Sequence, residues 1–374
     1  MFSSPTFVRL LATAAVVTLA IIPAQAQAPA QQNPSAAAQP AGKADADMQK
    51  VLDTLAKLEP KPIESLEPSE ARKQPTPTDA VLKIVKDEKI KADPREGLSV
   101  SNSHFADMGN LRLRTYTPEN ANKDANLPVI VYFRGGGWVI ASLDVYDASA
   151  AALARKANAI VVSVDYPMAP EKKFPAAHDE AIDAYKYIAK NVKSWGGDPA
   201  KIAIVGESAG GNLAVNTAIA ARDQNLAKPV AVVAVYPVAT TSQDTPSKKE
   251  HAQAKPLNTA MMGWFFKHVL PDDKAKDDPR LNLVAAKLDG LPPTTIINAE
   301  FDPLTSEGEM LAEKMKGAGV QVTHKFYPGV THEFFGMDAV VAKAKEAQDF
   351  AVAQLKSAFG GGAATVGTGT AKPQ

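Results

Sequence analysis

The sequence predicts an α/β protein with a mostly parallel, doubly wound sheet that begins with an antiparallel hairpin and carries a helical cap. Short β-branched segments, apolar on both faces, alternate with helical segments, which is typical of parallel strands flanked by helices. A long insertion at 240–278 interrupts this alternation and is expected to cover the carboxyl edge of the sheet, where such folds bind ligands. The predicted strands of the parallel part are 128–133, 159–165, 202–205, 230–236, 294–299 and 320–327.

The remaining elements follow in chain order. Apolar residues at helical spacing predict an amphipathic helix at 48–58, and a second helix is expected at 80–90. Two alternating segments, 98–105 and 111–117, flank a Met-Gly-Asn turn and predict the hairpin. Further helices are expected between and after the strands, at 144–157, 175–193, 209–225, 304–316 and 339–359.

Both ends lie outside the predicted domain, 48–359. Residues 1–26 combine Arg9, an uncharged apolar run and Ala-Gln-Ala, which is the layout of a signal peptide. The run is shorter than the roughly 20 residues of a membrane span, although an uncleaved anchor remains the alternative because only one charge precedes it. The Ala/Gln/Pro-rich stretch 27–47 is expected to be a linker and 360–374 a flexible tail. We therefore expect export, to the periplasm or beyond, with no stable membrane insertion after cleavage.

Composition excludes several classes of function. The 41 Lys and Arg residues balance 41 Asp and Glu, so no net charge attracts nucleic acid. The absence of cysteine rules out disulfides, cysteine-ligated metals and a thiolate nucleophile. Neither of the two glycine-rich nucleotide-binding motifs, G-x-G-x-x-G and the P-loop, is present. The chemistry must therefore use oxygen, nitrogen or a cofactor.

The most informative motif is Gly-Glu-Ser208-Ala-Gly, which follows the predicted strand 202–205 and precedes a helix. It fits G-x-S-x-G, in which a strained strand-to-helix turn exposes the serine. The two outer positions are glycines because a side chain there would collide with the neighbouring strand or helix. The helix N-terminus also stabilises negative charge near Ser208. An incidental serine in a glycine-rich turn is the alternative, but the strand–turn–helix context favours a nucleophile.

A serine nucleophile needs a histidine base and an acid. In proteins with this strand–turn–helix motif the chain order is serine, then Asp or Glu, then His. Among the histidines after the serine, His332 stands at the correct sheet edge beyond the last strand, whereas His324 lies within that strand and His251 and His268 lie in the insertion. The preceding strand is followed by Glu300 and Asp302, and both are in range. Asp302 precedes a proline and could instead cap the next helix, so Glu300 stays as an alternative.

Acyl transfer also needs hydrogen-bond donors for an oxyanion. The segment Arg134-Gly-Gly-Gly-Trp138 follows the predicted strand 128–133. Glycines let backbone N–H groups approach a reacting carbonyl, and each such donor is worth about 10²–10³ in rate. A flexible glycine turn without this role is the alternative.

Together these motifs resemble the hormone-sensitive-lipase-like group (bacterial family IV) of α/β-hydrolase esterases, over roughly 48–359. The similarity rests on five landmarks in order. They are Arg134-Gly-Gly-Gly-Trp138, Asp165-Tyr-Pro-Met-Ala-Pro-Glu171 with Phe174-Pro-Ala-Ala177, Gly206-Glu-Ser-Ala-Gly-Gly211, Asp302-Pro-Leu304, and Tyr327-Pro-Gly329 with His332-Glu-Phe-Phe335.

The resemblance implies an α/β-hydrolase fold, a triad of Ser208, Asp302 and His332, and oxyanion donors from the N–H groups of Gly136, Gly137 and Ala209. It also implies a cap built from about 48–95 and 240–278, and purely structural roles for Asp165 and Glu171.

Three residues depart from the family pattern. Arg134 replaces the usual His, Glu207 stands where Asp or Thr is commoner, and Glu333 replaces the usual Gly. We expect Arg134 either to reach solvent or pair with an acid, or to orient the glycine loop differently or attract an anionic substrate group.

The predicted function is hydrolysis of short- to medium-chain carboxylic esters through an acyl-enzyme, with a small-molecule ester as partner and no metal or organic cofactor. The alternatives are an acetyl-sugar, amide or peptide hydrolase that uses the same triad, or a non-catalytic ligand-binding member of the fold.

Overall fold

The computed structural model describes residues 42–106, 110–121 and 124–360, and the elements named below all lie in the compact unit that begins at Lys43. Its strands form one sheet in the order β1-β2-β4-β3-β5-β6-β7-β8. The pairs β1–β2 and β2–β4 are antiparallel, and every other neighbouring pair is parallel. The strands are β1 (Leu98–Phe105), β2 (Leu111–Pro118), β3 (Leu127–Phe133), β4 (Ile160–Val164), β5 (Gly197–Glu207), β6 (Val232–Val235), β7 (Thr294–Phe301) and β8 (Val322–Thr331).

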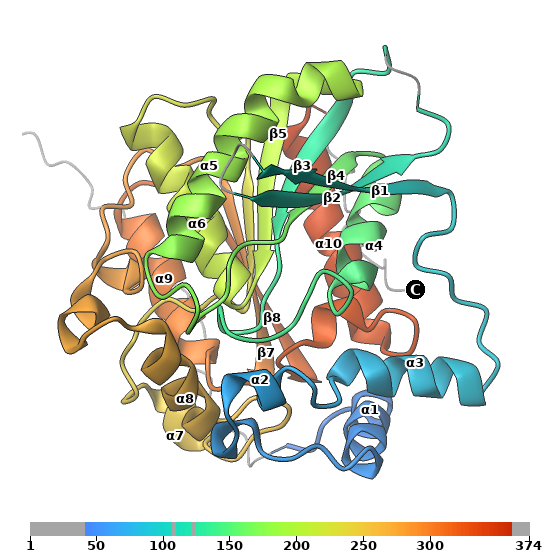
Figure 1. Ribbon diagram of the computed structural model, residues 1–374, viewed down its shortest axis with the longest axis vertical. Helices are drawn as coiled ribbons and strands as arrows, with labels where there is room; N and C mark the ends of the chain where they lie inside the picture. Colours follow the sequence, from blue (N-terminus) through green and yellow to red (C-terminus); the bar gives the residue numbers. More distant parts are fainter. Residues whose placement is uncertain (1–41, 107–109, 122–123, 361–374) are drawn as a thin grey trace, which may run out of the picture. The chain divides into compact units, whose positions relative to one another are not determined.

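Helices cover both faces of the sheet (Figure 1). One face carries α5 (Ala176–Asn191), α6 (Ala209–Asp223) and α9 (Thr305–Gly317), and the other carries α4 (Asp147–Ala157) and α10 (Ala342–Ala358). Further helices gather beyond the carboxyl ends of the parallel strands. They are α1 (Ala46–Lys57), η1 (Ile63–Ser65), α2 (Pro68–Ala71), α3 (Pro77–Asp87), α7 (Pro246–Glu250) and α8 (Thr259–Val269).

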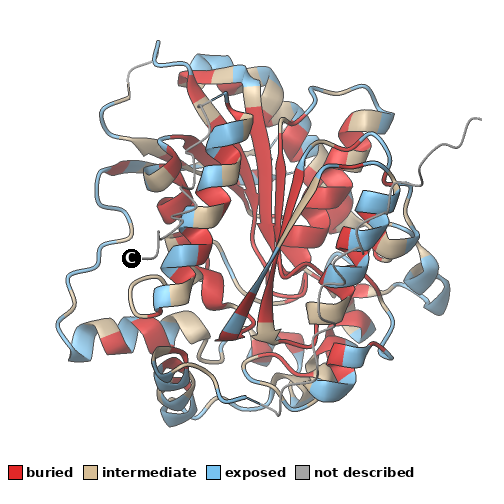
Figure 2. Cartoon of the chain, turned by 180° about the vertical axis from the view of Figure 1, so that it is seen from behind, coloured by how far each residue is buried: buried red, intermediate tan, exposed pale blue. Residues whose placement is uncertain are grey.

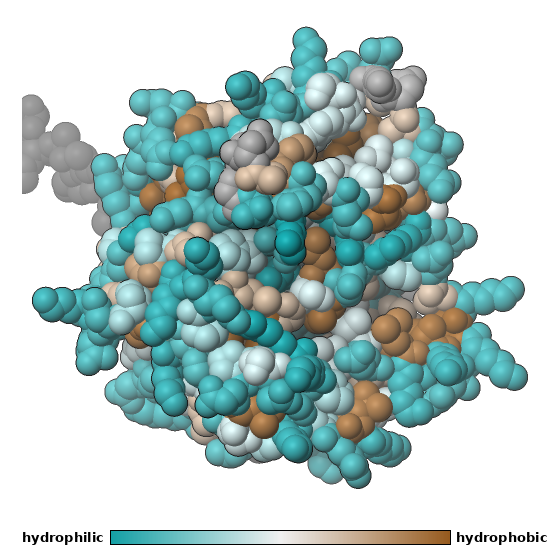
Figure 3. Space-filling model, in the orientation of Figure 1, coloured by the Kyte–Doolittle hydropathy of each residue, from teal (hydrophilic) through white to brown (hydrophobic). Residues whose placement is uncertain are grey.

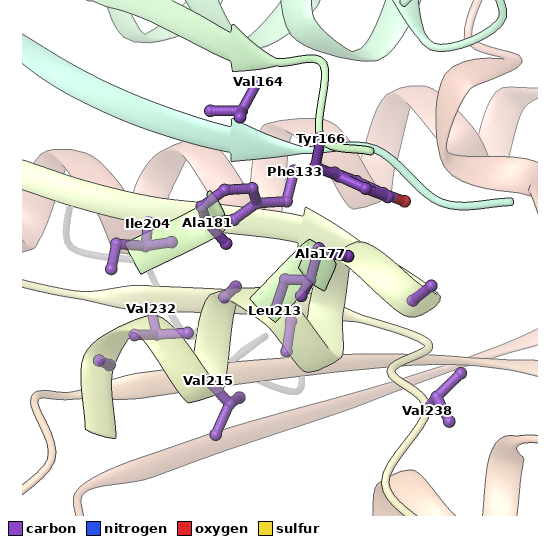
Figure 4. Close-up of a cluster of buried hydrophobic side chains, with 14 of the residues drawn as sticks. Phe133, Val164, Tyr166, Ala177, Ala181, Ile204, Leu213, Val215, Val232 and Val238 are labelled. Atoms are coloured by element: carbon purple, nitrogen blue, oxygen red, sulfur yellow. The ribbon is translucent and has the colours of Figure 1, made fainter. Parts of the chain in front are cut away.

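The central strands are buried on both faces because successive side chains point to opposite helix layers. In β3, Val129, Val131 and Phe133 pack into the core under α5 and α6, while Ile130 and Tyr132 pack into the core under α4 and α10. Figure 2 shows the resulting buried strands at the centre of the molecule. Figure 4 shows the first of these cores, in which small helical side chains let α5 and α6 lie close to the sheet. The predicted mostly parallel sheet with an antiparallel start is confirmed.

Element boundaries differ from the sequence predictions at several points. Helix α1 starts at Ala46 rather than residue 48, and α3 starts at Pro77 because Thr76 and Asp79 form a capping box. Strand β8 continues past Tyr327 to Thr331: the register shifts between the pairs Ala299–Tyr327 and Phe301–Thr331, and the extra residues lie in β8. The longer β8 brings the strand to the residue immediately before His332.

The predicted signal peptide (1–26), most of the predicted linker (27–47) and nearly all of the predicted tail (360–374) lie outside the described residues. Within the described ranges, no helix has both the length and the apolar character needed to cross a bilayer. On the face shown in Figure 3, hydrophobic side chains form small patches separated by hydrophilic ones.

Candidate active site

Ser208 stands alone in the turn between β5, which ends at Glu207, and α6, which begins at Ala209. Its φ of 56° and ψ of −119° are strained for a residue with a side chain, and its N–H donates to the carbonyl of Val235 at 2.9 Å. A Cβ at Gly206 would collide with the carbonyl of Gly210, and one at Gly210 would collide with the carbonyl of Phe133. The flanking glycines are therefore required for the close packing of this turn, as the motif predicts.

The pairing of β7 with β8 brings the predicted acid and base together. Phe301 pairs with Thr331 across the two strands, so Asp302 and His332 leave the sheet side by side. The Nδ1 atom of His332 lies 2.7 Å from Oδ2 of Asp302, and its Nε2 atom lies 2.9 Å from Oγ of Ser208. All three side chains are buried. The structure thus joins three residues, each at the end of a different strand, in one hydrogen-bonded chain.

The carboxylate of Asp302 divides its two oxygens between two partners. Oδ2 faces His332, while Oδ1 accepts the N–H of Leu304 at 2.8 Å, just before α9 begins. Helix α9 has Leu304 at its N-cap and no side-chain capping bond, so the helix-cap alternative for Asp302 is wrong: its second oxygen holds the turn before the helix while the first contacts the histidine. The alternative acid, Glu300, turns away and accepts the N–H of Gly329 at 2.6 Å.

Burial by itself lowers the pKa of His332, but the charge and hydrogen bond of Asp302 outweigh it. Glu333 and Glu207 add further negative potential, so the pKa of His332 is raised above its ordinary value. The other candidate histidines lie elsewhere: His268 packs against Trp264, His251 faces Phe301, and His324 stays in β8.

The glycine loop after β3 is held by Arg134, whose side chain is completely buried. Its Nη1 atom lies 3.1 Å from the carbonyl oxygens of both Gly135 and Ile140, and its guanidinium stacks on the ring of Tyr166 at 4.4 Å. Nη2 lies 3.7 Å from a carboxylate oxygen of Asp165. Pairing with an acid is therefore correct, whereas the expectations of a solvent-exposed or substrate-binding arginine are wrong.

Gly136 and Gly137 have φ angles of +97° and +56°, a region that favours glycine. A Cβ at Gly137 would strike the ring of Phe265 in α8, and one at Gly136 would strike the carbonyl of Ile140. Both glycines line the same pocket as Ser208. Ala209 is fully buried at the first position of α6.

The carboxylate of Glu207 lies behind the histidine with two tyrosine partners, and the sequence reasoning missed these contacts. Glu207 accepts hydrogen bonds from the hydroxyls of Tyr132 and Tyr236, each at 2.5 Å. The ring centroid of Tyr236 lies 4.4 Å from that of His332. Burial raises the pKa of Glu207 to about 7. The available signal was two tyrosines at the carboxyl ends of buried strands, directed by the pleat toward the same face.

The pocket over Ser208 has a volume of about 390 Å³. The two segments predicted as a cap form its roof and contact each other: Trp264 donates to the carbonyl of Leu66 at 2.9 Å, and Asn258 donates to Glu64 at 3.0 Å. The wall combines apolar cap side chains with the residues of the site. It includes Ile63, Leu257, Met261, Phe265, Gly136, Gly137, Ser208, His332 and Glu333. Among the described residues, no cluster of three or more His, Asp or Glu side chains is arranged to hold a metal ion.

Comparison with known proteins agrees with this geometry. A family model described as "alpha/beta hydrolase fold" matches residues 130–336. The chain is 38% identical to the carboxylesterase NlhH of Mycobacterium tuberculosis, over 67% of this chain and 80% of that protein. It is 32% identical to an ethyl acetate hydrolase of Pseudomonas putida, over 76% of this chain and 88% of that protein.

Solved esterase structures share the fold. An esterase of Pyrobaculum calidifontis matches with a TM-score of 0.73 and 34% identity, over 81% of this chain and 97% of that one. An α/β hydrolase from a Lake Arreo metagenome matches with a TM-score of 0.75 and 33% identity, over 85% of this chain and 99% of that one. Fold and site define a serine ester hydrolase. The chain belongs to the hormone-sensitive-lipase-like family of α/β-hydrolase esterases.

Proposed function

We propose that the protein hydrolyses short- to medium-chain carboxylic esters through an acyl-enzyme formed on Ser208. The observation that carries this proposal is the continuous chain from Oγ of Ser208 through His332 to Asp302, with distances of 2.9 and 2.7 Å. His332 Nε2 takes the hydroxyl proton while Oγ attacks the acyl carbon, and Asp302 stabilises the imidazolium and fixes its tautomer. The same Nε2 then gives its proton to the leaving alcohol, and water releases the acid.

The oxyanion of the tetrahedral intermediate is assigned to the N–H groups of Gly136, Gly137 and Ala209. Two observations support this assignment. Both glycines border the pocket at Ser208, and Ala209 begins α6, so its amide belongs to the positive end of the helix. Arg134 contributes indirectly because it holds the carbonyls on either side of these glycines.

The size and lining of the pocket favour a small ester. A volume of about 390 Å³ under an apolar roof accommodates an acyl chain and a modest alcohol, but not a folded polypeptide. The names of two relatives, a carboxylesterase and an ethyl acetate hydrolase, also favour esters over amides. Acetylated sugars remain the nearest alternative substrate because they present the same acyl group.

A series of p-nitrophenyl esters from acetate to decanoate, assayed beside matched anilides, tests the substrate assignment. We expect the highest kcat/KM at short to medium chain length and negligible anilide cleavage. Labelling of Ser208 by a fluorophosphonate, located by peptide mass, separates an enzyme from a non-catalytic ligand-binding protein. Absence of both labelling and turnover in the folded protein would refute the proposal.

We further propose that the protein is exported, to the periplasm or beyond, and that cleavage follows Ala26. Arg9, the apolar run after it and Ala-Gln-Ala at 24–26 support this proposal. N-terminal sequencing of the protein expressed from its full reading frame tests it. A mature chain beginning at Gln27 is expected, and an intact N-terminus on an intracellular protein would contradict it.

A further inference from the structure

Glu333 places a carboxylate in the pocket immediately beside the histidine. The residue follows His332 directly and has a φ of 71°, which turns the chain sharply at that point. Its Oε1 atom accepts a hydrogen bond from the hydroxyl of Tyr146 at 2.5 Å and lies 3.9 Å from Nε2 of His332. The side chain retains 21% exposure and lines the pocket. Within the described residues, its second oxygen, Oε2, accepts no hydrogen bond.

The location of Nε2 determines which part of a substrate meets this carboxylate. The leaving oxygen must come within hydrogen-bond distance of Nε2 to receive its proton. Glu333 is held 3.9 Å from the same nitrogen, so it lies beside the alcohol portion of the ester rather than beside the nucleophile alone. A hydroxyl on the carbon next to the ester-bearing carbon would be about one hydrogen-bond length from the leaving oxygen, which is within reach of the free oxygen of Glu333.

Burial raises the pKa of Glu333, and His332 and the hydroxyl of Tyr146 oppose this rise. In its ionised form the carboxylate only accepts hydrogen bonds, so its natural partner is then a donor. A hydroxyl suits this pocket better than an ammonium group, because Lys61 and Lys255 also belong to the wall. Among the described residues neither lysine forms an ion pair, so their positive charge opposes entry of a cation. Negatively charged alcohols are disfavoured by Glu333 itself.

We infer that Glu333 is a specificity residue that selects esters whose alcohol carries a free hydroxyl next to the ester, such as monoesters of glycols, glycerol or sugars. Tyr146 is the positioning residue that holds the carboxylate. This inference rests on the proposed function because it assumes that His332 protonates the leaving oxygen.

Two isosteric substrates test the inference: 2-hydroxyethyl acetate and propyl acetate, which differ only by OH in place of CH₃. The ratio of their kcat/KM values, each divided by its rate of alkaline hydrolysis, is compared in wild type, Glu333→Gln and Glu333→Met. Glu300→Gln is the matched control, since it removes a nearby carboxylate outside the pocket wall. Active serines are counted by fluorophosphonate titration.

We expect a ratio above one in wild type, a fall of about tenfold in Glu333→Met, as for the loss of one charged hydrogen bond, and a smaller fall in Glu333→Gln. Tyr146→Phe should lower the ratio partially, and Glu300→Gln should leave it unchanged. An unchanged ratio in Glu333→Met would overturn the inference. So would a preference of wild type for acetylcholine over its neutral isostere, 3,3-dimethylbutyl acetate.

Failure of the proposed function gives a different result. In that case wild type hydrolyses none of 2-hydroxyethyl acetate, propyl acetate and p-nitrophenyl acetate, and Ser208 is not labelled. If p-nitrophenyl acetate is cleaved and Ser208 is labelled, but the kcat/KM ratio of the two acetates is the same in wild type and Glu333→Met, only the specificity inference fails.

Discussion

Asp302 and His332 are joined at 2.7 Å by one carboxylate oxygen, while the other oxygen of Asp302 holds the N–H of Leu304 at 2.8 Å. The second contact prevents rotation of the carboxylate, so the imidazole is presented to Ser208 in one orientation. Because Phe301 and Thr331 are paired just before these residues, the sheet itself sets their separation.

Asp302→Asn should therefore lower kcat by about 10³–10⁴-fold with little change in thermal stability. The amide nitrogen would face Nδ1 and favour the wrong histidine tautomer. Steady-state kinetics and thermal unfolding of this variant and of Glu300→Gln give the comparison. A larger loss of activity in Glu300→Gln would reassign the acid.

Arg134→Met should lower kcat while KM for neutral esters stays nearly constant. The substitution removes the Arg134 donors to the carbonyls of Gly135 and Ile140. Gly135 keeps the hydroxyl of Tyr166 at 3.0 Å, whereas the carbonyl of Ile140 loses its donor. We expect a loss of about 1–3 kcal/mol in the free energy of unfolding, since each buried polar group without a partner is costly. Urea denaturation and kinetics measure both effects. A rise in KM confined to anionic esters would instead indicate that Arg134 binds substrate.

Lys248 and Glu307 form an ion pair with no solvent exposure, their charged atoms 2.8 Å apart. Glu307 also accepts the backbone N–H groups of Ala239 and Thr240 at 2.6 and 2.9 Å, so it connects the start of the cap insertion to α9. Lys248→Met leaves a buried charge unpaired and should lower the free energy of unfolding by about 3–5 kcal/mol. The double variant Lys248→Met/Glu307→Gln should recover part of that loss in urea titrations. Equal stability of wild type and Lys248→Met would contradict this account.

Glu207 should make stability depend on pH. Its pKa is raised by burial from 4.5 to about 7. Below pH 4.5 the carboxyl is protonated in both states, and between 4.5 and about 7 the folded protein keeps a proton that the unfolded chain has released. Stability therefore falls as pH rises through this window, by up to about 3 kcal/mol.

Glu207→Gln should lack this contribution, while Glu307 and Glu333, whose pKa values burial also raises, still titrate in the variant. His178, whose pKa burial lowers to about 4, titrates in both proteins and cancels in their difference. Unfolding free energies of both proteins at pH 4.5, 6 and 7.5 provide the measurement. Parallel pH curves for the two proteins would show that Glu207 is not the titrating group.

The sequence predicted the sheet because its strands carry their own signal. Segments such as β3 are short, β-branched and apolar on both faces, and only a parallel sheet between helix layers buries them. It also predicted which residues would meet at the carboxyl edge. Ser208 lies between two glycines at positions where any side chain would collide with neighbouring backbone. That local requirement can be recognised from the five-residue motif.

What the sequence could not supply depends on contacts between distant segments. The direction of Arg134 follows from carbonyls that the loop presents only after it folds back on itself. Strand β8 continues past Pro328 and Gly329, which look like a turn and lie where the register with β7 is irregular, because pairing resumes beyond them at Thr331. Glu333 accepts a hydrogen bond from Tyr146, which lies in another layer of the fold, so no spacing in the sequence predicts their contact.

The proposed mechanism depends on Ser208, which forms the acyl-enzyme. The most direct measurement is kcat for p-nitrophenyl butyrate in wild type and Ser208→Ala at equal concentrations of folded protein. We predict a loss of at least about 10³-fold in Ser208→Ala, with an unchanged unfolding transition. Activity within a few fold of wild type in the purified variant would contradict it.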